Sequence, residues 1–314
     1  MMKRIKRSLK GRYWRKVITY FLTCCLFLNT SLPAVMAGPV GGVVDTSPTG
    51  GGTAEILYGQ DPFGHTTQVN VDTTRTIINW DSLNTEGGIP EVRETLAFSQ
   101  GGLTGSAVLN RVSGPATQFN GDLSAPGMSI FIVNPAGVLF GGGSTVNVTQ
   151  LVASGLDMQN GAFHAVLDDP VNNKMEFVGG DGEVTSRAYI TADSVILIGK
   201  QVFNLGPIQA PDGLVVMAAG DEVRLYENGS DVAVVVSELG GGTPDVRNSG
   251  YISASNGTIV LAAGDIYSRA ISNVGILAAS GGTVKLQAAS VENGGWIDVD
   301  ASTSDGDGGS ISLI

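Results

Sequence analysis

The sequence predicts an all-β protein built as a parallel β-helix, a solenoid in which successive coils stack on one another. Glycine is abundant, with 45 residues in 314, whereas aromatic residues make up only 6%, a composition that favours short strands and tight turns. After residue 38 no stretch keeps the 3.6-residue apolar period of an amphipathic helix. The second half also repeats itself at intervals that suit a coil made of strands and turns.

Residues 1–37 are predicted to be a secretory signal peptide. They carry eight Lys or Arg residues and no acidic residue, and an apolar run follows from Val17 to Leu28. Small residues end the segment, so we expect cleavage after Ala37. A membrane anchor is an alternative, but the run is shorter than the roughly 20 apolar residues that span a bilayer. A lipoprotein signal at Cys24 and Cys25 is a weaker alternative, because the apolar run continues past them.

The chain that follows the signal is acidic and free of cysteine. The net charge is −11 for the whole chain and becomes −19 when the eight basic residues of the signal are removed. Both cysteines lie in the signal, so an exported form cannot use disulfides and must depend on its core. No basic patch is present to neutralise phosphates, which argues against a nucleic-acid partner.

The most apolar stretch of the first half is interrupted by turn residues. It reads FIVNPAGVLFGGG and covers residues 131–143. We interpret 131–133 as one short strand, 134–137 as a corner, 138–140 as the next strand and 141–143 as another turn. The apolar residues on both sides of the corner can then contribute to one solenoid core.

Four related segments follow in the second half. NLGPIQAPDGLVVMAAG begins at Asn204, NSGYISASNGTIVLAAG at Asn248, NVGILAASGGTVKLQAA at Asn273 and NGGWIDVDAS at Asn293. Intervals of 20 to 25 residues made only of strands and turns indicate a parallel β-helix. The first interval, of 44 residues, fits either two coils or one coil with an insertion between Arg224 and Arg247.

Alternation in the third repeat predicts which side chains face the core. Lys285 and Gln287 belong outside, so Val284, Leu286 and Ala288 point inward. By alignment the inward set also includes Val215, Met217, Ala219, Ile259, Leu261, Ala263, Ile208, Ile252, Leu277 and Ile297, and the outward set includes Pro207, Tyr251, Ile276 and Trp296.

The repeated asparagines predict a column at one corner, where stacked amides bond from coil to coil. We attribute to the glycine two residues later a turn that other residues would resist. The final GGSISLI repeats one strand of the coil and stops. A solenoid ending in mid-coil leaves unpaired edge groups, so we expect a partner or further sequence to cap it, or the chain to be a piece of a longer protein.

Six ordered motifs carry a family resemblance. They are TIINWDSLN (76–84), FSQGG (98–102), VLNRVSG (108–114), GDLSAPG (121–127), FIVNPAGVLFGGG (131–143) and VNVTQLVASGLDM (146–158). Their order and spacing closely resemble the N-terminal secretion domain of filamentous-haemagglutinin-like proteins, the exported partners of two-partner secretion systems. The resemblance covers about residues 40 to 300.

The resemblance implies a right-handed parallel β-helix with an N-terminal β cap and hairpin insertions. We divide the chain after the signal into a secretion domain at residues 38–190 and continuing β-helix repeats at residues 191–314. It further implies passage through the periplasm, recognition by the periplasmic domains of an outer-membrane β-barrel transporter, and export to the cell surface or medium. An adhesin that binds carbohydrate or protein on host or neighbouring cells is the endpoint it suggests.

The candidate secretion residues are Asn134, Pro135 and Gly137, with Asn110 and Arg111 in support. The family signature is an Asn-Pro-Asn-Gly-Ile element after an L-N-R-V element. This chain departs from it at Ala136, which replaces the second Asn and removes a hydrogen-bonding side chain. No Asn-Pro-Asn-Leu element is present, which places the chain in a subfamily without it. The corner either contacts the transporter or only shapes the turn, and both alternatives stay open.

Little in the sequence indicates catalysis, a metal or a cofactor, and we expect none of them. The only histidines, His65 and His164, do not suit a metal cluster or a catalytic triad. The glycine runs 50–52, 141–143 and 240–242 lack the Lys-Ser/Thr that closes a phosphate loop. Segments 179–183 and 304–310 resemble calcium-binding repeats only faintly, and turns explain them.

A carbohydrate-active enzyme is the alternative function, because other parallel β-helices carry polysaccharide lyases and hydrolases. Asp298 and Asp300, predicted on one outward face, would have Cα atoms about 7 Å apart, a spacing compatible with paired catalytic carboxylates. Solvated acids on an acidic solenoid are the simpler interpretation. Asp168 and Asp169 precede a proline in an expected loop and are interpreted in the same way.

Overall fold

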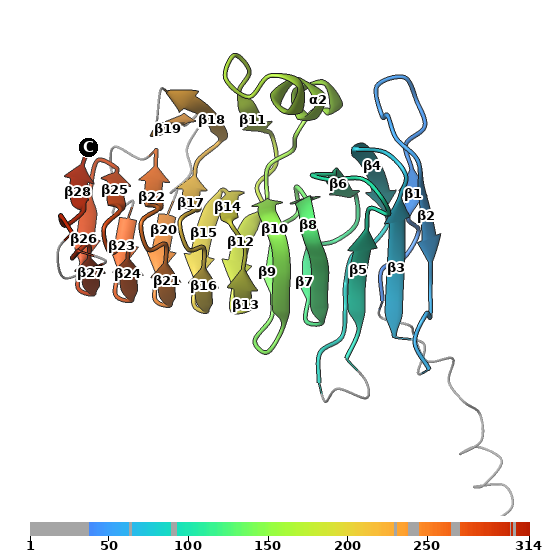
Figure 1. Ribbon diagram of the computed structural model, residues 1–314, viewed down its shortest axis with the longest axis horizontal. Helices are drawn as coiled ribbons and strands as arrows, with labels where there is room; N and C mark the ends of the chain where they lie inside the picture. The colour runs from blue at the N-terminus through green and yellow to red at the C-terminus, as the bar shows by residue number, and fades with distance from the viewer. Residues whose placement is uncertain are drawn as a thin grey trace, which may run out of the picture. The chain divides into compact units, whose positions relative to one another are not determined.

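The computed structural model describes residues 38–62, 65–88, 93–228, 231–237, 245–264, 271–301, 303 and 306–314. The predicted signal and its cleavage site at Ala37 lie outside the described residues, as do the glycine run 240–242 and part of segment 304–310. Residues 38–314 form one compact unit. In it the strands stack in parallel as a right-handed β-helix, as predicted (Figure 1).

Three faces of parallel strands make up the coil. The first face contains β3 (Thr66–Val71), β5 (Thr95–Ser99), β8 (Asp122–Val133), β10 (Thr145–Ser154), β13 (Tyr189–Thr191), β16 (Pro207–Gln209), β21 (Tyr251–Ser253), β24 (Ile276–Ala278) and β27 (Trp296–Asp298). The long strands β8 and β10 continue onto the second face, and their mutual register shifts between Val148 and Gln150.

The second face adds β4 (Arg75–Trp80), β6 (Ala107–Val112), β14 (Ser194–Gly199), β17 (Leu214–Ala219), β22 (Thr258–Ala263), β25 (Thr283–Gln287) and β28 (Ser310–Leu313). The third face consists of β7 (Thr117–Phe119), β9 (Val138–Phe140), β12 (Glu183–Ser186), β15 (Gln201–Asn204), β20 (Asp245–Asn248), β23 (Ile271–Asn273) and β26 (Val291–Asn293). The boundary drawn at residue 190 stays a prediction, and the parallel ladder runs across it through β13.

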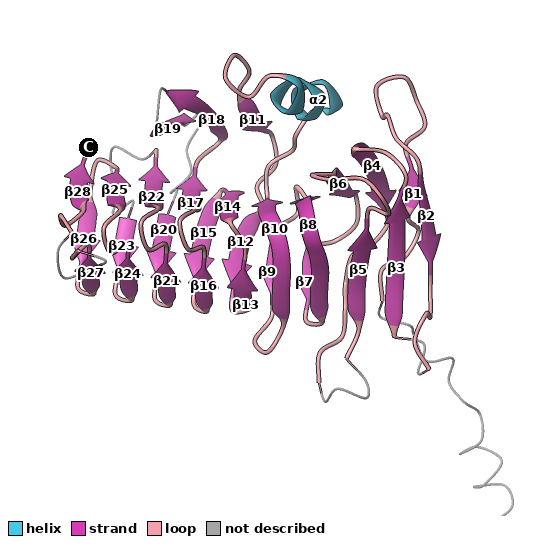
Figure 2. Ribbon diagram, in the orientation of Figure 1, coloured by secondary structure: helices cyan, strands magenta, loops and turns pink. Residues whose placement is uncertain are grey.

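Two antiparallel additions form the predicted N-terminal cap. β1 (Val43–Val44) pairs with β4, and β2 (Ala54–Leu57) pairs with β3. These strands cover the first edge of the solenoid, which would otherwise present unpaired backbone groups (Figure 2).

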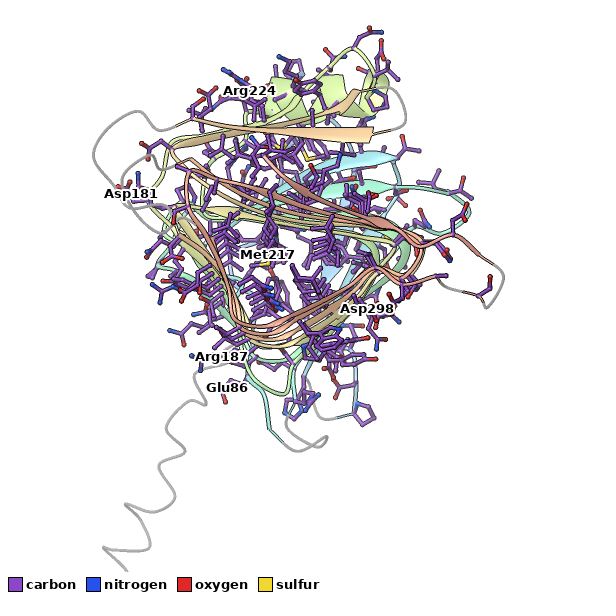
Figure 3. The ribbon with its side chains drawn as sticks, turned by 90° about the vertical axis from the view of Figure 1, so that its left-hand side faces the viewer. Glu86, Asp181, Arg187, Met217, Arg224 and Asp298 are labelled. Atoms are coloured by element: carbon purple, nitrogen blue, oxygen red, sulfur yellow. The ribbon has the colours of Figure 1, made fainter. Side chains whose placement is uncertain are left out.

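Side-chain alternation on the faces agrees with the prediction. Val215, Met217, Ile259, Leu261 and their counterparts in the third repeat are buried in one continuous core. In the end-on view Met217 lies inside the coil (Figure 3). The predicted outward residues Tyr251, Ile276 and Trp296 are exposed. A strand period of two residues was therefore enough to assign the side chains that lie inside the coil.

A second layer covers the outer side of the second face. A hairpin insertion was predicted and forms part of this layer, whereas its helix was not predicted. It consists of the helix α2 (Asn160–Asp168) and the antiparallel strands β11 (Met175–Val178), β18 (Glu222–Asn228) and β19 (Asp231–Ser237). Outward residues of the second face, such as Phe131, Val216 and Val260, pack beneath it in a separate apolar cluster. The rings of Phe131 and Phe163 of α2 meet edge to face at 5.3 Å.

This layer decides between two alternatives for the long interval and corrects one expectation. The 44-residue interval is one coil with an insertion, because β17 pairs directly with β22 and the β18–β19 hairpin lies between them in sequence. Asp168 ends α2 rather than lying in a loop, and it forms an ion pair with Arg75. A nine-residue helix that buries only Phe163 and Val166 is too short to show a sustained period in the sequence.

The asparagine column is present as predicted. The Nδ2 of Asn204 donates to the Oδ1 of Asn248 at 2.9 Å, Asn248 donates to Asn273 at 2.8 Å, and Asn273 donates to Asn293 at 2.7 Å. The first three side chains are fully buried. Each amide nitrogen therefore donates to the side-chain oxygen of the asparagine in the next coil, which provides hydrogen bonds for polar groups inside the corner.

The glycine that follows each asparagine serves a different purpose from the one expected. Gly250 and Gly275 do not adopt a positive φ. A Cβ at Gly250 would instead lie 2.2 Å from the carbonyl oxygen of Gly206, and one at Gly275 would lie 2.1 Å from that of Gly250. Glycine is required because successive coils approach too closely at this corner for a side chain.

Candidate functional site at the Asn134 corner

The corner at 134–137 connects β8 of the second face with β9 of the third face, as predicted. The Asn134 carbonyl accepts a hydrogen bond from the Gly137 N–H at 2.8 Å, which closes a β-turn. The Asn134 side-chain oxygen accepts a second bond from the Ala136 N–H at 2.9 Å. Gly137 has a φ of 116°, a conformation that residues with a Cβ rarely adopt. Asn134 and Gly137 thus determine the shape of the turn.

Asn134 also joins three successive coils. Its Nδ2 donates to the Pro115 carbonyl at 2.9 Å and to the Thr117 hydroxyl at 3.0 Å, both in the preceding coil. Its backbone N–H donates to the Ser154 carbonyl, at 2.9 Å, in the following coil. The side chain is 1% exposed, so it is not available on the surface of the folded corner.

The middle of the turn faces outward. Ala136 is exposed and Pro135 is half-buried. Pro135 lies against Gly180 of the next coil, where an added Cβ would come within 3.0 Å of the proline ring. The position that departs from the family signature is therefore at the surface, while the hydrogen bonds that shape the turn come from Asn134.

Asn110 lies one coil before the corner and is fully buried. Its Oδ1 accepts a bond from the Trp80 indole N–H at 3.0 Å, and its Nδ2 donates to the Phe131 carbonyl at 3.1 Å. Asn110 thus provides a hydrogen-bond acceptor for the indole N–H of a buried tryptophan and holds β6 against β8. A buried amide in this position strengthens the packing of the strand that leads to the corner.

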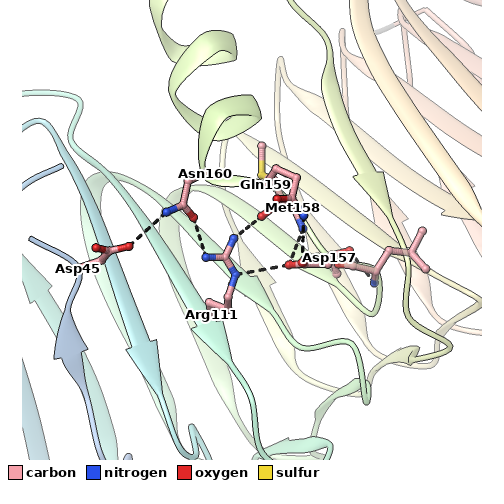
Figure 4. A network of polar contacts seen from close by, with 8 residues as sticks. Asp45, Arg111, Asp157, Met158, Gln159 and Asn160 are labelled. Atoms are coloured by element: carbon pink, nitrogen blue, oxygen red, sulfur yellow. Dashed lines mark hydrogen bonds and ion pairs between the residues drawn. The ribbon is translucent and has the colours of Figure 1, made fainter. Parts of the chain in front are cut away.

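Arg111 points to the opposite side of β6, toward the outer layer (Figure 4). Its Nη1 donates to the Asn160 Oδ1 at 2.7 Å, its Nε to the Asp157 Oδ1 at 3.4 Å, and its Nη2 to the Met158 carbonyl. Asn160 donates in turn to the Asp45 carboxylate at 3.2 Å. Arg111 therefore ties the solenoid to the segment before α2 and, through Asn160, to the chain after β1.

Hydrogen bonds from Ser47 lower the pKa of Asp45, and Asn160 and Arg111 add to this effect. Asp45, Asp157 and Asn160 were not among the residues predicted to have a role. A signal was present for Asp157, because it lies in the quoted motif 146–158. Nothing in the sequence placed Asp45 beside them, because 115 residues separate it from Asn160.

The structure brings the five candidate residues into one neighbourhood. Arg111 pairs with Val133 in the register of β6 and β8, so it lies on the rung next to Asn134. Of the five, Asn110 and Asn134 are buried, Arg111 is engaged by the outer layer, and the exposed part of the corner is at Pro135 and Ala136.

The other sites considered in the sequence are turns or surface contacts. Asp298 ends β27 and its carboxylate accepts the Asp300 N–H at 2.9 Å, so Asp300 follows in a turn rather than on the same strand face. The His164 Nε2 lies 3.1 Å from the Thr49 carbonyl. In the part of the chain that the structure describes, no cluster of His, Cys, Asp or Glu suits a metal ion.

Among the described residues, no helix has the length and apolar character needed to cross a bilayer. The turn at Asp298 does not support the enzyme alternative. Within the described ranges, the Asn134 corner carries the motif that the family resemblance singles out.

Comparisons with known proteins agree with this fold. The secretion domain of HMW1 from Haemophilus influenzae has a similar structure, with a TM-score of 0.61 and 24% identity over 88% of this chain and 76% of that one. The filamentous hemagglutinin secretion domain matches with a TM-score of 0.51 and 15% identity, over 88% of this chain and 99% of that one.

In sequence, the chain is 28% identical over 187 residues to the heme/hemopexin-binding protein of Haemophilus influenzae. The match covers 56% of this chain and 19% of that relative. The family model described as TPS secretion domain matches residues 63–313. The chain therefore belongs to the TPS secretion domain family, the exported proteins of two-partner secretion systems.

Proposed function

We propose that this chain is the export module of a two-partner secretion protein and that the periplasmic domains of an outer-membrane β-barrel transporter recognise it. The observation that carries the proposal is the family match over residues 63–313, on a solenoid that carries the secretion motif as an ordered corner. The family implies an exported protein and a transporter partner. The proposal goes beyond the family in two respects: it names the residues that the transporter contacts, and it specifies a route through the periplasm.

We assign different parts of the motif to shape and to recognition. Asn134, Asn110 and Arg111 support the corner from within or behind it, through the hydrogen bonds described above. Gly137 permits its backbone conformation. Recognition then falls to the exposed backbone and side chains around Pro135 and Ala136, because a partner can reach only surface groups.

Residues 1–37 supply the signal for entry into the periplasm in this proposal, with cleavage after Ala37. After translocation the protein is secreted or displayed at the cell surface. A cysteine-free solenoid suits this route, since each coil contacts only its neighbours and can fold in turn as it emerges.

For the exported protein as a whole we propose an adhesin-like role, with carbohydrate or protein on host or neighbouring cells as partner. The relative named a heme/hemopexin-binding protein offers binding of heme or hemopexin as a precedent, and this chain spans about a fifth of that relative. Binding of intact, processed protein to cultured host cells would test this role. Binding no greater than that of an unrelated acidic protein would count against it.

A secretion assay tests the export function. The full chain is produced in a Gram-negative host with and without its outer-membrane transporter, and the processed protein is measured in the medium and the periplasm. We expect export only with the transporter. Equal amounts in the medium without it would refute the proposal.

The corner is tested in the same assay with Ala136→Lys, and Ala136→Asn serves as the matched control because it restores the residue usual in the family. We expect Ala136→Lys to reduce export severalfold with unchanged folded stability, since the position is exposed. Export of Ala136→Lys at the normal level would place recognition elsewhere on the domain.

A further inference from the structure

The first described residue lies beside a buried acid. An ideal Cβ at Gly38 would lie 3.0 Å from the Glu94 Oε1 and 4.0 Å from its Oε2. Pro39, which follows, is buried, and Val40 pairs with Ser82 through a backbone hydrogen bond of 2.8 Å. Residues 38–40 are therefore held against Ser82 and Glu94.

Glu94 has little compensation for its burial. The residue is 9% exposed, and its Oε2 accepts one hydrogen bond, from the Glu86 N–H at 2.5 Å. Within the described part of the chain, no Lys or Arg forms an ion pair with it, and the nearby Arg93 pairs with Asp122 instead. A buried carboxylate with one hydrogen bond carries a desolvation cost that a positive partner would offset.

Two neighbouring residues, Glu86 and His65, act on Glu94 in addition to this desolvation. Burial raises the pKa of its carboxyl, the nearby Glu86 carboxylate adds to this, and His65 together with the Glu86 N–H opposes it. Glu86 is exposed and His65 is half-buried, so solvent screens both. The Oε1 atom faces Gly38, at the start of the same compact unit.

We propose that Glu94 is a binding site for a primary ammonium group, the α-amino terminus that signal removal creates on Gly38. The inference rests on the proposed cleavage after Ala37. The ideal Cβ of a residue lies about 2.5 Å from its own nitrogen, so the nitrogen of Gly38 is within about 5.5 Å of the Glu94 Oε1. Opposite charges at this separation stabilise each other's charged forms.

The pair would couple processing to completion of the N-terminal cap. Before cleavage the Gly38 nitrogen is a neutral amide and Glu94 remains without a cationic partner there. After cleavage the new ammonium fixes the segment that leads into β1. Glycine is suited to this position, because a side chain there would press on the carboxylate that it must approach.

The test compares two proteins processed in vivo from full chains that carry the signal. One begins at Gly38, and the other carries a Gly-Ser insertion between Ala37 and Gly38, which moves the ammonium away from Glu94. The α-amine pKa is measured by NMR titration, and the unfolding equilibrium by denaturant.

For the Gly38 form we expect an amine pKa at least one unit above the ordinary 7.7–8.0, and an ordinary value for the insertion form. Because the pKa of the amine is raised by folding, its stabilising effect is complete below about pH 7.7 and is lost as the pH rises through the folded-state value.

Glu94→Gln should return the amine pKa of the Gly38 form to the ordinary range and raise its unfolding constant about tenfold more than that of the insertion form. Glu55→Gln, which changes an exposed acid of β2, is the matched control and should change neither. An ordinary amine pKa in the unmodified Gly38 form would overturn the proposal by itself, even if Glu94→Gln failed to fold.

Equal destabilisation of both forms by Glu94→Gln would also overturn it, as would a processed terminus other than Gly38. The purified proteins need no transporter, so failure of export in the secretion assay leaves this result independent.

Discussion

Replacing Asn134 with Ala should destabilise the corner strongly. The change removes one buried hydrogen bond, to the Thr117 hydroxyl at 3.0 Å, and two part-buried ones, to the Pro115 carbonyl at 2.9 Å and from the Ala136 N–H at 2.9 Å. A buried bond contributes about 0.5–1.5 kcal/mol, and an unsatisfied partner left behind costs about 1–3 kcal/mol. We expect the free energy of unfolding to fall by roughly 2–4 kcal/mol from the loss of these three bonds together.

The assay is guanidinium unfolding of the processed protein, followed by the secretion assay on the same variant. Ala136→Ser, at the exposed neighbouring position, is the matched control and should change the free energy of unfolding by less than about 0.5 kcal/mol. A loss below 0.5 kcal/mol in Asn134→Ala would refute the assignment of Asn134 to the turn. Export lost with stability intact would assign this residue to direct recognition instead.

Three further changes test the stacking of the coils and the outer layer. Gly250→Ala should prevent normal stacking or cost more than about 3 kcal/mol, because its Cβ would lie 2.2 Å from the Gly206 carbonyl oxygen of the preceding coil, whereas Gly142→Ala, with no atom within 4 Å, should be nearly neutral in thermal unfolding. Asn248→Ala breaks the buried amide column on both sides and should cost about 2–4 kcal/mol in denaturant unfolding, and a neutral result would contradict a stabilising column. Phe163→Ala should cost about 3–5 kcal/mol and expose the second face to hydrophobic dyes, and unchanged dye binding would show that the layer does not cover it.

The coils could be predicted because their sequence signals are local and repeated. Alternation around Lys285 gives the inward residues, and the spacing of the asparagines places one residue of each coil at the same corner. A repeat has to satisfy the same geometry in every coil, so each copy confirms the others. The corner at 134–137 could be predicted because its signal is also local: Asn-Pro and Gly mark a turn independently of the rest of the chain.

The outer layer could not be predicted in this way, since it depends on contacts between distant segments that do not repeat. One signal did exist. The run from Val215 to Ala219 is apolar without interruption, which is typical of a strand that is buried on both faces. Alternation assigned a buried position only to every second residue of this run. Val216 and Ala218 in fact lie beneath the β18–β19 hairpin layer. The insertion that created the long first interval therefore supplies the cover for those residues.

The reason for the repeated glycines also required the structure. A glycine in a turn suggests a positive φ, but Gly250 and Gly275 are needed for the close approach of one coil to the next. The difference matters for substitutions. Asn can replace a glycine that has a positive φ, because Asn tolerates that conformation, whereas any side chain at Gly250 or Gly275 would overlap the neighbouring carbonyl.

The arrangement of the motif explains how one short element can serve both folding and recognition. Asn134 uses its whole side chain inside the protein and bonds to the coil before it, while its backbone bonds to the coil after it. The corner therefore has its final shape only when three successive coils are in place. Pro135 and Ala136 carry no such bonds through their side chains and lie at or near the surface. A transporter that contacts this surface would then recognise the stacked coils at 115–154. Replacing Asn134 should therefore reduce export by disturbing the fold, whereas replacing Ala136 should reduce export without disturbing the fold.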